Sequence, residues 1–510
     1  MQSFLSKHAD KITEVLSCFD RLIFKGYLPI SYPQGMENFL QGHDILLKDF
    51  KAFGPQQAQR LKEHAQTLAA QAGRPFLYCE RRIRKEEQAQ DIARRDHVTQ
   101  GLICVFSVLE TCPTCRILYG KGRPRLKKDY RRCLVLYYYF LDPEFGLLHI
   151  RIPTWFPLTI QVYLNGHEWL ARTLDQHGLG YQRRDNAFLA LDDPQRAQAL
   201  ADRLLHKKWP RFLNALAKRV NPLLGDLLQG CSYTWVTDQA EFATDVLFKD
   251  RAALQSLYPR LLEHATLHFR AEDVLSYLGR KMPNRCTGEV LNDTKKQPQG
   301  FRVKHHHEGN WLKMYDKFGQ VLRIEVVINR PQVFQVRRWG TRKGQRVFAW
   351  FALRKNVVHL GRYAEVSLQA TGRYLAALAV VDAPQVSQRL LDKVCERVPF
   401  QGRTRRGLNP LSRADQHLFT AVLRGEHALR GFSSRDVAGH LGVVASRDPK
   451  ERRRQSARIS RSLQLLRAHG LIAKIPHRRR YRVTARGFAF MSTALHLRFK
   501  AFPAQMSDVG

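Results

Sequence analysis

Two short segments of the chain carry side chains that can act on a phosphodiester. Leu312–Lys317 and Val321–Ile328 have the composition of strands, and Phe318-Gly-Gln320 between them has that of a tight turn. A tyrosine can attack a phosphorus atom, cations can neutralise the phosphate, and a carboxylate can hold a divalent cation. The polar residues of these strands that combine these groups are Lys313, Tyr315, Lys317, Arg323 and Glu325.

The length of the turn decides which side chains share a face. A three-residue loop pairs Lys317 with Val321 and therefore sets Tyr315 opposite Arg323, whereas a two-residue loop sets Tyr315 opposite Leu322. A slip of one residue turns every side chain to the other face, so only one register separates polar from apolar residues. We predict the three-residue loop, because it alone gives an apolar face of Leu312, Met314, Ile324 and Val326.

On the predicted polar face, Tyr315 is the candidate nucleophile. Lys313 and Arg323 are the candidate catalytic cations, because neighbouring cations favour the phenolate form of a tyrosine. Glu325, which faces Lys313 in this register, is a candidate ligand for Mg²⁺ or Mn²⁺. A surface hairpin with charge pairs across its strands explains the same residues without catalysis, so the sequence leaves open whether the protein is an enzyme.

The phrases Lys-Met-Tyr-Asp-Lys and Leu-Arg-Ile-Glu in this hairpin resemble the corresponding stretch of rolling-circle plasmid replication initiators. In that family a tyrosine between basic residues nicks DNA. The resemblance covers only this hairpin, and it implies Tyr315 as the nucleophile and Glu325 as a metal ligand. The His-hydrophobe-His motif of the larger nicking superfamily is absent, and we expect the run His305–Glu308 to lie in a solvated loop.

Other acidic residues offer a second kind of metal site. Asp238, Glu241 and Asp245 follow the strand-like Tyr233–Val236, where we predict the start of a helix with all three on one face. Asp238 and Glu241 are candidate ligands for a nuclease or transposase that uses carboxylates alone. Acids that stabilise a helix dipole explain the same spacing. Asp20, at the start of a strand-like run, is another acid that could join such a site.

The cysteines give a weaker signal. Cys112-Pro-Thr-Cys115 has the spacing of half a zinc site, but no second pair follows it, so we expect free cysteines there rather than structural Zn²⁺. Nine cysteines in so long a chain do not form the pattern of a disulfide framework. The aromatic run Tyr137–Tyr139 could stack bases, but its apolar setting favours core packing.

The charge of the chain requires a partner. Its 84 Lys+Arg and 45 Asp+Glu give a net charge of +39, and such a charge repels itself unless a polyanion neutralises it. We predict nucleic acid, DNA before RNA, rather than a membrane surface. No apolar run is long enough to span a bilayer, and the N-terminus does not read as a signal peptide. We therefore expect a cytoplasmic, nucleoid-associated protein.

The length predicts three or four domains, and we expect a multidomain α+β chain with a mixed α/β body. The predicted divisions are a helical, basic N-terminal region at 1–100, an α+β domain at 101–230, an α+β domain with the candidate hairpin at 231–398, a linker at 399–410 and a C-terminal domain at 411–510.

The C-terminal domain has the order helix, helix, long basic helix and short hairpin, which resembles a winged helix. Residues 401–490 hold 21 Lys+Arg and 5 Asp+Glu, so they supply +16 of the +39 and leave +23 upstream. The resemblance implies that the long helix enters a major groove and that the arginine tip of the hairpin contacts an adjacent groove or phosphates. The candidate nucleic-acid-binding residues are Arg452, Arg453, Arg454, Arg458, Arg461, Arg478, Arg479 and Arg480.

The whole chain also resembles an uncharacterised family of bacterial proteins, through phrases such as FDRLIFKG, LDPEFGLLHIRI and VYLNGHEWLAR. That resemblance implies a bacterial source and no activity. We therefore carry three hypotheses: a plasmid or mobile-element protein that nicks or joins DNA through Tyr315 with a divalent metal, a non-enzymatic DNA- or structured-RNA-binding protein, and a nuclease or transposase that depends on Asp and Glu alone. A homodimer is compatible with each.

Overall fold

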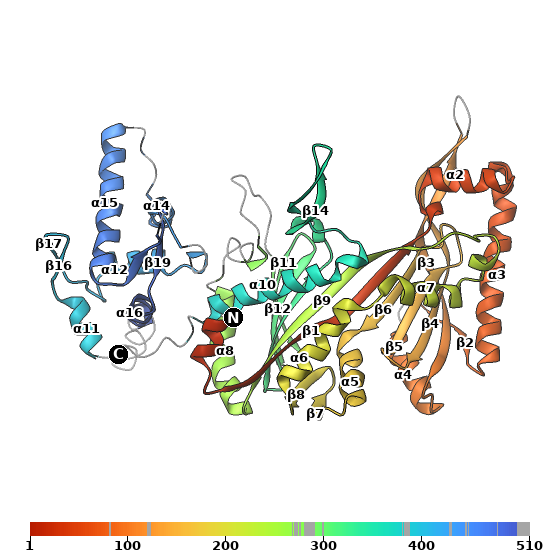
Figure 1. The fold of residues 1–510 in the computed structure, drawn as a ribbon, viewed down its shortest axis with the longest axis horizontal. Coiled ribbons are helices and arrows are strands. Elements are labelled where there is room, and N and C mark those ends of the chain that lie inside the picture. The colour runs from red at the N-terminus through yellow and green to blue at the C-terminus, as the bar shows by residue number, and fades with distance from the viewer. Residues whose placement is uncertain are drawn as a thin grey trace, which may run out of the picture. The chain divides into compact units, whose positions relative to one another are not determined.

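We describe the protein from a computed structural model (Figure 1). The structure describes residues 1–510 except 81–82, 120–123, 268, 270–273, 275–276, 280–290, 298–299, 380, 382–387, 428–430, 444–445, 447, 477 and 497–510. The chain folds into two compact units. The sheet unit comprises Thr13–Arg251 and Asp293–Leu368, and the terminal unit comprises Met1–Ile12, Ala252–Asn292 and Gln369–Gly510. Each unit joins segments that are distant in the sequence, whereas the divisions predicted from the sequence are consecutive ranges.

The protein is a mixed α/β protein, as the sequence predicted, and its main feature is one large mixed sheet. In the described part of the chain this sheet has 11 strands in the order β10-β11-β12-β13-β9-β1-β6-β5-β4-β3-β2 (Figure 1). The strands are β1 (Ile12–Tyr27), β2 (Phe76–Tyr78), β3 (Gly101–Leu118), β4 (Arg125–Asp142), β5 (Gly146–Pro153), β6 (Ile160–Asn165), β9 (Thr234–Phe248), β10 (Leu291–Gln297), β11 (Gly300–His307), β12 (Asn310–Lys317) and β13 (Val321–Ile328).

Helices cover one face of this sheet more fully than the other. Along β1, Leu22 and Phe24 are completely buried, whereas Ile23 and Lys25, which alternate with them, are partly exposed. The ring of Phe24 packs 4.8 Å from that of Trp209 on the covered face. The helices grouped beside this part of the sheet in Figure 1 are α5 (Gly166–Gln176), α6 (Pro194–Asp202) and α7 (Trp209–Val220).

Two strands at the middle of the sheet are buried on both faces. Every residue of β13 is buried, and so is every residue of β9 from Ala240 onward. Apolar residues such as Ile324 and Val326 explain most of that burial, but β13 also carries Arg323 and Glu325. Charged side chains at such positions must find charged or hydrogen-bonding partners, because an unpaired charge is very costly in a low-dielectric interior.

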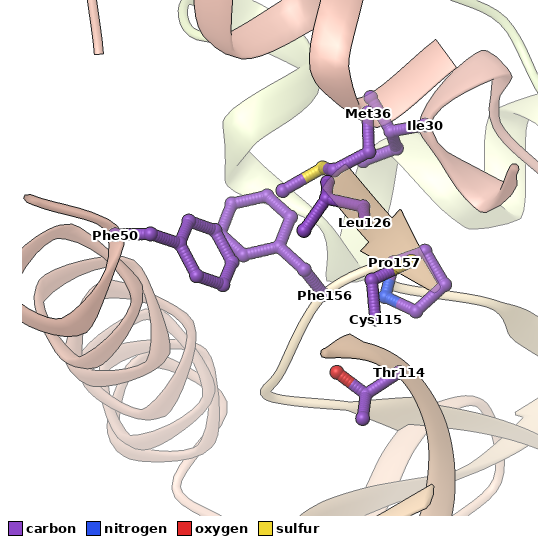
Figure 2. Close-up of a pocket in the computed structure, with 8 residues that line it drawn as sticks. All are labelled: Ile30, Met36, Phe50, Thr114, Cys115, Leu126, Phe156 and Pro157. Carbon is purple, nitrogen blue, oxygen red and sulfur yellow. The ribbon is translucent and has the colours of Figure 1, made fainter. Parts of the chain in front are cut away.

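The remaining elements of the sheet unit cover its ends and edges. They are the helices α2 (Pro33–Gly42), α3 (Phe50–Gln71) and α4 (Lys85–Arg95) and the hairpins β7 (Tyr181–Arg184) with β8 (Ala187–Leu191) and β14 (Gln335–Arg342) with β15 (Gln345–Ala352). A gap of about 10 Å³ near α2 and α3 is lined almost entirely by apolar side chains, including Met36, Phe50 and Phe156 (Figure 2). Because a space of that volume holds about one water molecule at most, this gap is a packing defect rather than a ligand site.

The terminal unit contains α1 (Gln2–Lys7), α8 (Arg251–Leu267), most of α10 (Leu360–Leu378) and the C-terminal elements. The amino group of Met1 donates to the carbonyl oxygen of Gly372 at 2.7 Å, and Lys7 Nζ donates to that of Val381 at 2.7 Å. These bonds fasten α1 to the end of α10.

The C-terminal elements follow the predicted order of helices and hairpin. They are α11 (Gln388–Cys395), β16 (Val398–Phe400), β17 (Arg403–Arg405), α12 (Arg413–Val422), α14 (Ser434–His440), α15 (Pro449–Ala468), β18 (Ile472–Lys474), β19 (Tyr481–Val483) and α16 (Ala485–His496). Ser433 and Asp436 form a capping box at the start of α14, and Gly470 follows α15 with φ +70°. Leu418, Leu466 and Phe490 pack in one apolar core.

Three predictions about local structure are wrong. The N-terminal region is not simply helical, because β1 runs through the centre of the sheet. The helix predicted after Val236 is a continuation of the strand β9. The polar segment that includes His305 forms β10 and β11 instead of a loop, and His305 is completely buried. In each case pairing with neighbouring strands prevails over the local composition.

Candidate functional site

The hairpin β12–β13 has the predicted register. Lys317 pairs with Val321, Tyr315 with Arg323, and Lys313 with Glu325. Phe318 and Gly319 take positive φ values of 60° and 76°, which close the three-residue turn. The hairpin is nevertheless an internal part of the sheet, since β11 flanks β12 and β9 flanks β13. Its polar side chains therefore face a largely enclosed environment, and the surface hairpin considered above does not describe them.

Arg323 lies at the centre of a buried polar network. Its side chain has 0% exposure, and its Nε and Nη2 atoms donate to the two carboxylate oxygens of Asp245 at 2.6 Å each. Nη2 also donates to the carbonyl oxygen of Asn186 at 2.7 Å. Among the described residues the Nη1 atom has no hydrogen-bond partner, and Oδ2 of Asp20 lies 3.9 Å from it.

His167 connects Arg323 with Asp20. Asn165 accepts a hydrogen bond from the backbone N–H of Glu168 and so starts α5 directly beside the sheet. Nε2 of His167 is 3.1 Å from Nη2 of Arg323, and Nδ1 is 2.8 Å from Oδ1 of Asp20. Because a carboxylate oxygen can only accept, Nδ1 of His167 donates to Asp20. Although burial opposes ionisation, His167 and then Arg323 hold the pKa of Asp20 well below its usual range.

Three carboxylates meet beside this network. Asp20 on β1, Glu241 on β9 and Glu325 on β13 each place an oxygen within 4.8 Å of the others. The three strands are adjacent in the sheet, so strand pairing alone brings together residues that are more than 300 positions apart in the sequence. Carboxylate oxygens at this separation are the ligands that Mg²⁺, Mn²⁺ and Ca²⁺ take in proteins.

Two cations lie against the carboxylates. Nζ of Lys313 bonds to Oε1 of Glu325 and lies 3.5 Å from Oε2 of Glu241, and Nη1 of Arg21 lies 3.8 Å from Oε1 of Glu241. Burial and the charge of Glu325 raise the pKa of Glu241 to about 7. Although burial alone would raise it, Lys313 holds the pKa of Glu325 below its usual range. Burial and the neighbouring charge of Glu325 therefore disfavour the carboxylate form of Glu241, and a divalent cation bound here would favour it.

Tyr315 is bound to this carboxylate group through its hydroxyl. The hydroxyl donates to Oε2 of Glu325 at 2.6 Å, and the residue is 8% exposed. Burial and the charge of Glu325 raise the pKa of Tyr315 well above its usual value. The expectation that Arg323 and Lys313 favour the phenolate is therefore wrong for this arrangement: the desolvation of the hydroxyl and its carboxylate partner outweigh the cations.

The structure brings together all but one of the predicted catalytic and metal-ligating residues. Glu325 and Glu241 lie together, as do Lys313, Tyr315 and Arg323. Asp238 does not join them, since its carboxylate lies 3.5 Å from Nζ of Lys355. Asp245, which the sequence placed on a helix, serves as the partner of Arg323.

Comparisons with known proteins do not identify the chain. No family model, no curated protein and no solved structure matches it. The function must therefore be argued from the residues of the site.

A run of aromatic rings leads away from the carboxylates on the less covered face of the sheet. Arg21 lies over the ring of Tyr163 at 5.5 Å, Tyr163 stacks on His149 at 4.9 Å, and the ring of Tyr139 is 5.1 Å from His149. Beyond them is a cavity of about 500 Å³, lined by Arg84, Lys85, Glu86, Glu87, Gln90, Tyr137, Tyr139 and His149. The expected core packing therefore holds for the buried Tyr138 and Tyr139, although the ring of Tyr139 also borders this cavity together with Tyr137.

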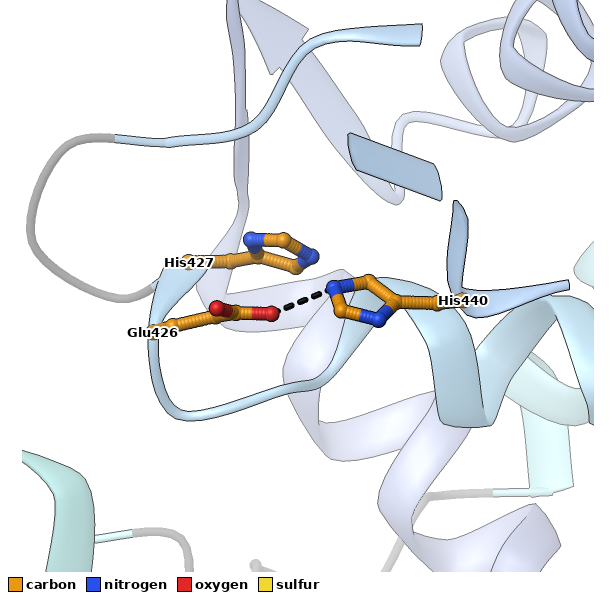
Figure 3. Close-up of side chains that lie close together, drawn as sticks. All are labelled: Glu426, His427 and His440. Carbon is orange, nitrogen blue, oxygen red and sulfur yellow. Dashed lines mark ion pairs between the residues drawn. The ribbon is translucent and has the colours of Figure 1, made fainter. Parts of the chain in front are cut away.

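A second group with metal-ligand chemistry lies in the terminal unit. Glu426, His427 and His440 place ligand atoms within 4.8 Å of one another, with Glu426 in an ion pair with His440 (Figure 3). His427 also bonds through Nε2 to the carbonyl oxygen of Ala421 at 3.2 Å. The ion pair and this bond join the segment after α12 to α14, so a structural role accounts for all three side chains.

The two cysteines of the predicted half zinc site stand three residues apart on the strand β3, and residues at that spacing point to opposite faces. Cys112 is buried, and Nη2 of Arg151 lies 3.3 Å from its sulfur atom.

The arginines predicted to bind nucleic acid are mostly available to a partner. Those of α15 and of the β18–β19 tip are exposed, namely Arg452, Arg453, Arg454, Arg458, Arg461, Arg478 and Arg479. Arg480 differs, because its Nη2 atom donates to the carbonyl oxygen of Gly431 at 2.7 Å and to Asp436 at 3.2 Å. No helix of the described residues is both long and apolar enough to cross a membrane.

The sequence missed the residues that complete the site. Asp20 was one of several acids that could join a metal site, but nothing in its neighbourhood pointed to Glu241 or Glu325 as its partners. His167 and Asn186 gave no signal, because they lie at the start of a helix and in the turn between β7 and β8. Only pairing between β1, β9 and β13 identifies these partners, and the sequence does not encode that pairing locally.

Proposed function

We propose that this protein binds nucleic acid and cleaves or transfers a strand with a divalent cation held by Asp20, Glu241 and Glu325. The observation that carries the proposal is the meeting of these three carboxylates in a chain of net charge +39. In so basic a protein, three adjacent carboxylates are an exception to the overall positive charge. A cation shared between them and a phosphate relieves their repulsion and polarises the phosphorus–oxygen bond.

The neighbouring residues suit this chemistry. Lys313 and Arg21 lie on the carboxylates and can neutralise charge that develops on a phosphate. Arg323 and His167 fix the orientation of Asp20, in the way that outer groups orient metal ligands. The partly exposed rings of Tyr163 and His149 supply stacking surfaces beside the site.

The test combines metal binding with strand cleavage. Mn²⁺ binding to the full chain is measured by calorimetry, and cleavage is measured on supercoiled plasmid and on labelled single-stranded DNA and RNA with Mg²⁺ or Mn²⁺. We expect Glu241→Gln and Glu325→Gln to lose both activities by at least about 100-fold. Glu365→Gln, which removes a surface carboxylate paired with Arg362, is the matched control.

Unchanged Mn²⁺ binding in a folded Glu241→Gln, Glu325→Gln double variant would overturn the proposal. Mn²⁺ binding without cleavage of any of these substrates would reduce the site to a structural metal site in a non-enzymatic nucleic-acid-binding protein, which is the alternative.

A second candidate function uses Tyr315 as the nucleophile, as in the rolling-circle initiators that the hairpin resembles. Its specific support is the hydrogen bond to Glu325, since a carboxylate in that position can accept the phenol proton. The two candidates differ in one variant. Tyr315→Phe abolishes cleavage and any covalent protein–DNA product in the tyrosine mechanism, and it leaves cleavage measurable in the carboxylate mechanism.

We also propose that the C-terminal elements form a winged helix that recognises the nucleic acid. The order α12, α14, α15, β18 and β19 and the exposed arginines of α15 support this assignment. The wider proposal is a cytoplasmic, nucleoid-associated bacterial protein of a plasmid or mobile element, which acts on DNA before RNA and is compatible with a homodimer. Electrophoretic mobility shifts with duplex DNA, single-stranded DNA and structured RNA test the choice of partner.

A further inference from the structure

A second surface of the sheet unit has the properties of a binding site. The hairpin β14–β15 forms a two-stranded sheet of its own, separate from the large sheet, and stands away from it in Figure 1. Lys343 and Gly344 take φ values of 51° and 79° and close the hairpin with a two-residue turn. The hairpin thus forms an arm beside the large sheet.

One face of this arm carries aromatic rings and arginines in alternation. The pairs Arg337 with Trp350 and Trp339 with Phe348 face each other across the strands, and residues two apart along a strand share a face. Their side chains therefore lie together on one surface, with Arg346 beyond them. Trp339 is 58% exposed, Phe348 43% and Trp350 67%.

The opposite face of the arm is packed differently. Val336 is buried there, and the guanidinium of Arg338 lies 5.0 Å from the centre of the Phe351 ring. Gly340 has no space for a side chain, because a Cβ atom would come within 2.8 Å of Phe351. The arm is thus stabilised from this face. The exposed rings on the other face form an apolar surface that the fold leaves in contact with water. Such a surface points to a binding partner.

The charge of the arm identifies the class of partner. Its residues 335–352 include Arg337, Arg338, Arg342, Lys343 and Arg346 and no acidic residue, which gives a net charge of +5. Arg337 lies 5.2 Å from the centre of the Phe348 ring, and Arg346 lies 5.5 Å from that of Trp339. Cations among the rings fit a ligand that combines flat faces with negative charge at short intervals, as a nucleic-acid strand does.

We propose that this face of the β14–β15 arm binds single-stranded nucleic acid. Bases stack on Trp339 and Trp350, and Arg337 and Arg346 contact the phosphates between them. A single strand is required because the faces of paired bases are covered by their neighbours in a duplex. A membrane anchor fits less well, since its arginines would lie at the rim of the rings instead of over them. This proposal specifies the substrate class of the proposed function. It rests on the nucleic-acid binding proposed above and does not depend on the carboxylate site.

The test measures affinity without cleavage. Binding of the full chain to a fluorescent 20-nucleotide single strand and to the matching duplex is followed by anisotropy in EDTA. We expect Trp339→Ala with Trp350→Ala to weaken single-strand binding by at least about tenfold and to change duplex binding much less. Tyr130→Ala, which removes a 72% exposed ring on β4, is the matched control. Circular dichroism and thermal unfolding verify that each variant is folded.

The arginines are tested through salt dependence. Arg337→Gln with Arg346→Gln should lower the slope of log affinity against log salt by about 1.4 for a single strand. Single-strand affinity and salt slope that equal those of the wild type in both double variants would overturn the proposal. So would loss of binding to phosphatidylserine–phosphatidylcholine vesicles with unchanged binding to the oligonucleotide. Because EDTA removes divalent cations, failure of the carboxylate proposal leaves these results unaffected.

Discussion

The hydroxyl of Tyr315 donates a 2.6 Å hydrogen bond to Oε2 of Glu325 within the buried part of the sheet. This bond assigns the tyrosine to the support of a carboxylate: it fixes the orientation of Glu325, and the hydroxyl keeps its proton. In the proposed metal site, a group in that position would act through its neighbour, and its loss would weaken the site without removing the chemistry.

Replacing the tyrosine distinguishes these roles. We expect Tyr315→Phe to retain cleavage at about one-tenth of the wild-type rate and to bind Mn²⁺ about tenfold more weakly, whereas Glu325→Gln loses both. The measurements are cleavage kinetics at several Mn²⁺ concentrations and calorimetric titration. If saturating Mn²⁺ restores no activity to a folded Tyr315→Phe variant, the tyrosine acts directly.

The ammonium group of Lys313 forms ion pairs with the carboxylates of both Glu241 and Glu325. Lys313→Met leaves two neighbouring carboxylates without it, and we expect thermal unfolding to show a loss of about 2 kcal/mol. Mn²⁺ should recover most of that loss, because a bound cation stabilises the folded state alone. Lys304→Met, which alters a lysine lying over the Trp311 ring, is the control. An equal response of both variants to Mn²⁺ would argue against a metal site.

The ion pair of Arg323 and Asp245 is buried and bidentate. Asp245→Asn leaves a completely buried guanidinium without its charge partner, and we expect a loss of about 3 kcal/mol in the free energy of unfolding. The surface pair of Arg362 and Glu365 provides the comparison, since Glu365→Gln should cost no more than about 0.5 kcal/mol. Urea denaturation measures both. Similar losses in the two variants would contradict the assigned burial.

His305 introduces a pH dependence of stability. Burial lowers the pKa of His305 to about 4, whereas an unfolded chain has a histidine pKa of about 6.5. Between these values the unfolded state takes up a proton that the folded state does not, so stability falls as the pH falls from 6.5 to 4 and is fully present above 6.5. The contribution reaches about 3 kcal/mol at pH 4.

Urea denaturation at pH 7, 6, 5 and 4.5 tests this dependence. His305→Leu should lessen the decrease in stability over this range, whatever its effect at pH 7. If the free energy of unfolding of His305→Leu decreases with falling pH as steeply as that of the wild type, the folded protein takes up the proton at His305 without cost.

The exposed arginines of α15 should set the salt dependence of duplex binding. Replacing Arg454, Arg458 and Arg461 with Gln removes up to three phosphate contacts and lowers the slope of log affinity against log salt by about 2.7. Arg480→Gln should act on stability instead, because that side chain is bonded to Gly431 and Asp436. A larger slope change from Arg480→Gln than from the triple variant would reverse these assignments.

Local patterns predicted the features that depend on near neighbours. The period of two in β12 and β13 and the length of their turn determined the register, because a slip would have mixed polar with apolar faces. The order of helices and hairpin predicted at the C-terminus also rests on local composition, and the structure has that order. The helix expected at Asp238–Asp245 failed, since a segment buried on both faces loses the alternation that marks a strand.

The sequence by itself determined the charge of the protein, the polar hairpin and the basic C-terminal helix with the short hairpin that follows it. Only the tertiary structure decided that the hairpin lies inside the sheet, that Asp20 joins Glu241 and Glu325, and that Tyr315 is a protonated partner of Glu325. The reason is physical: the order of strands in a sheet depends on the packing of the whole unit. Burial then reverses the effect of nearby cations on the tyrosine, because desolvation acts only once the fold has removed water.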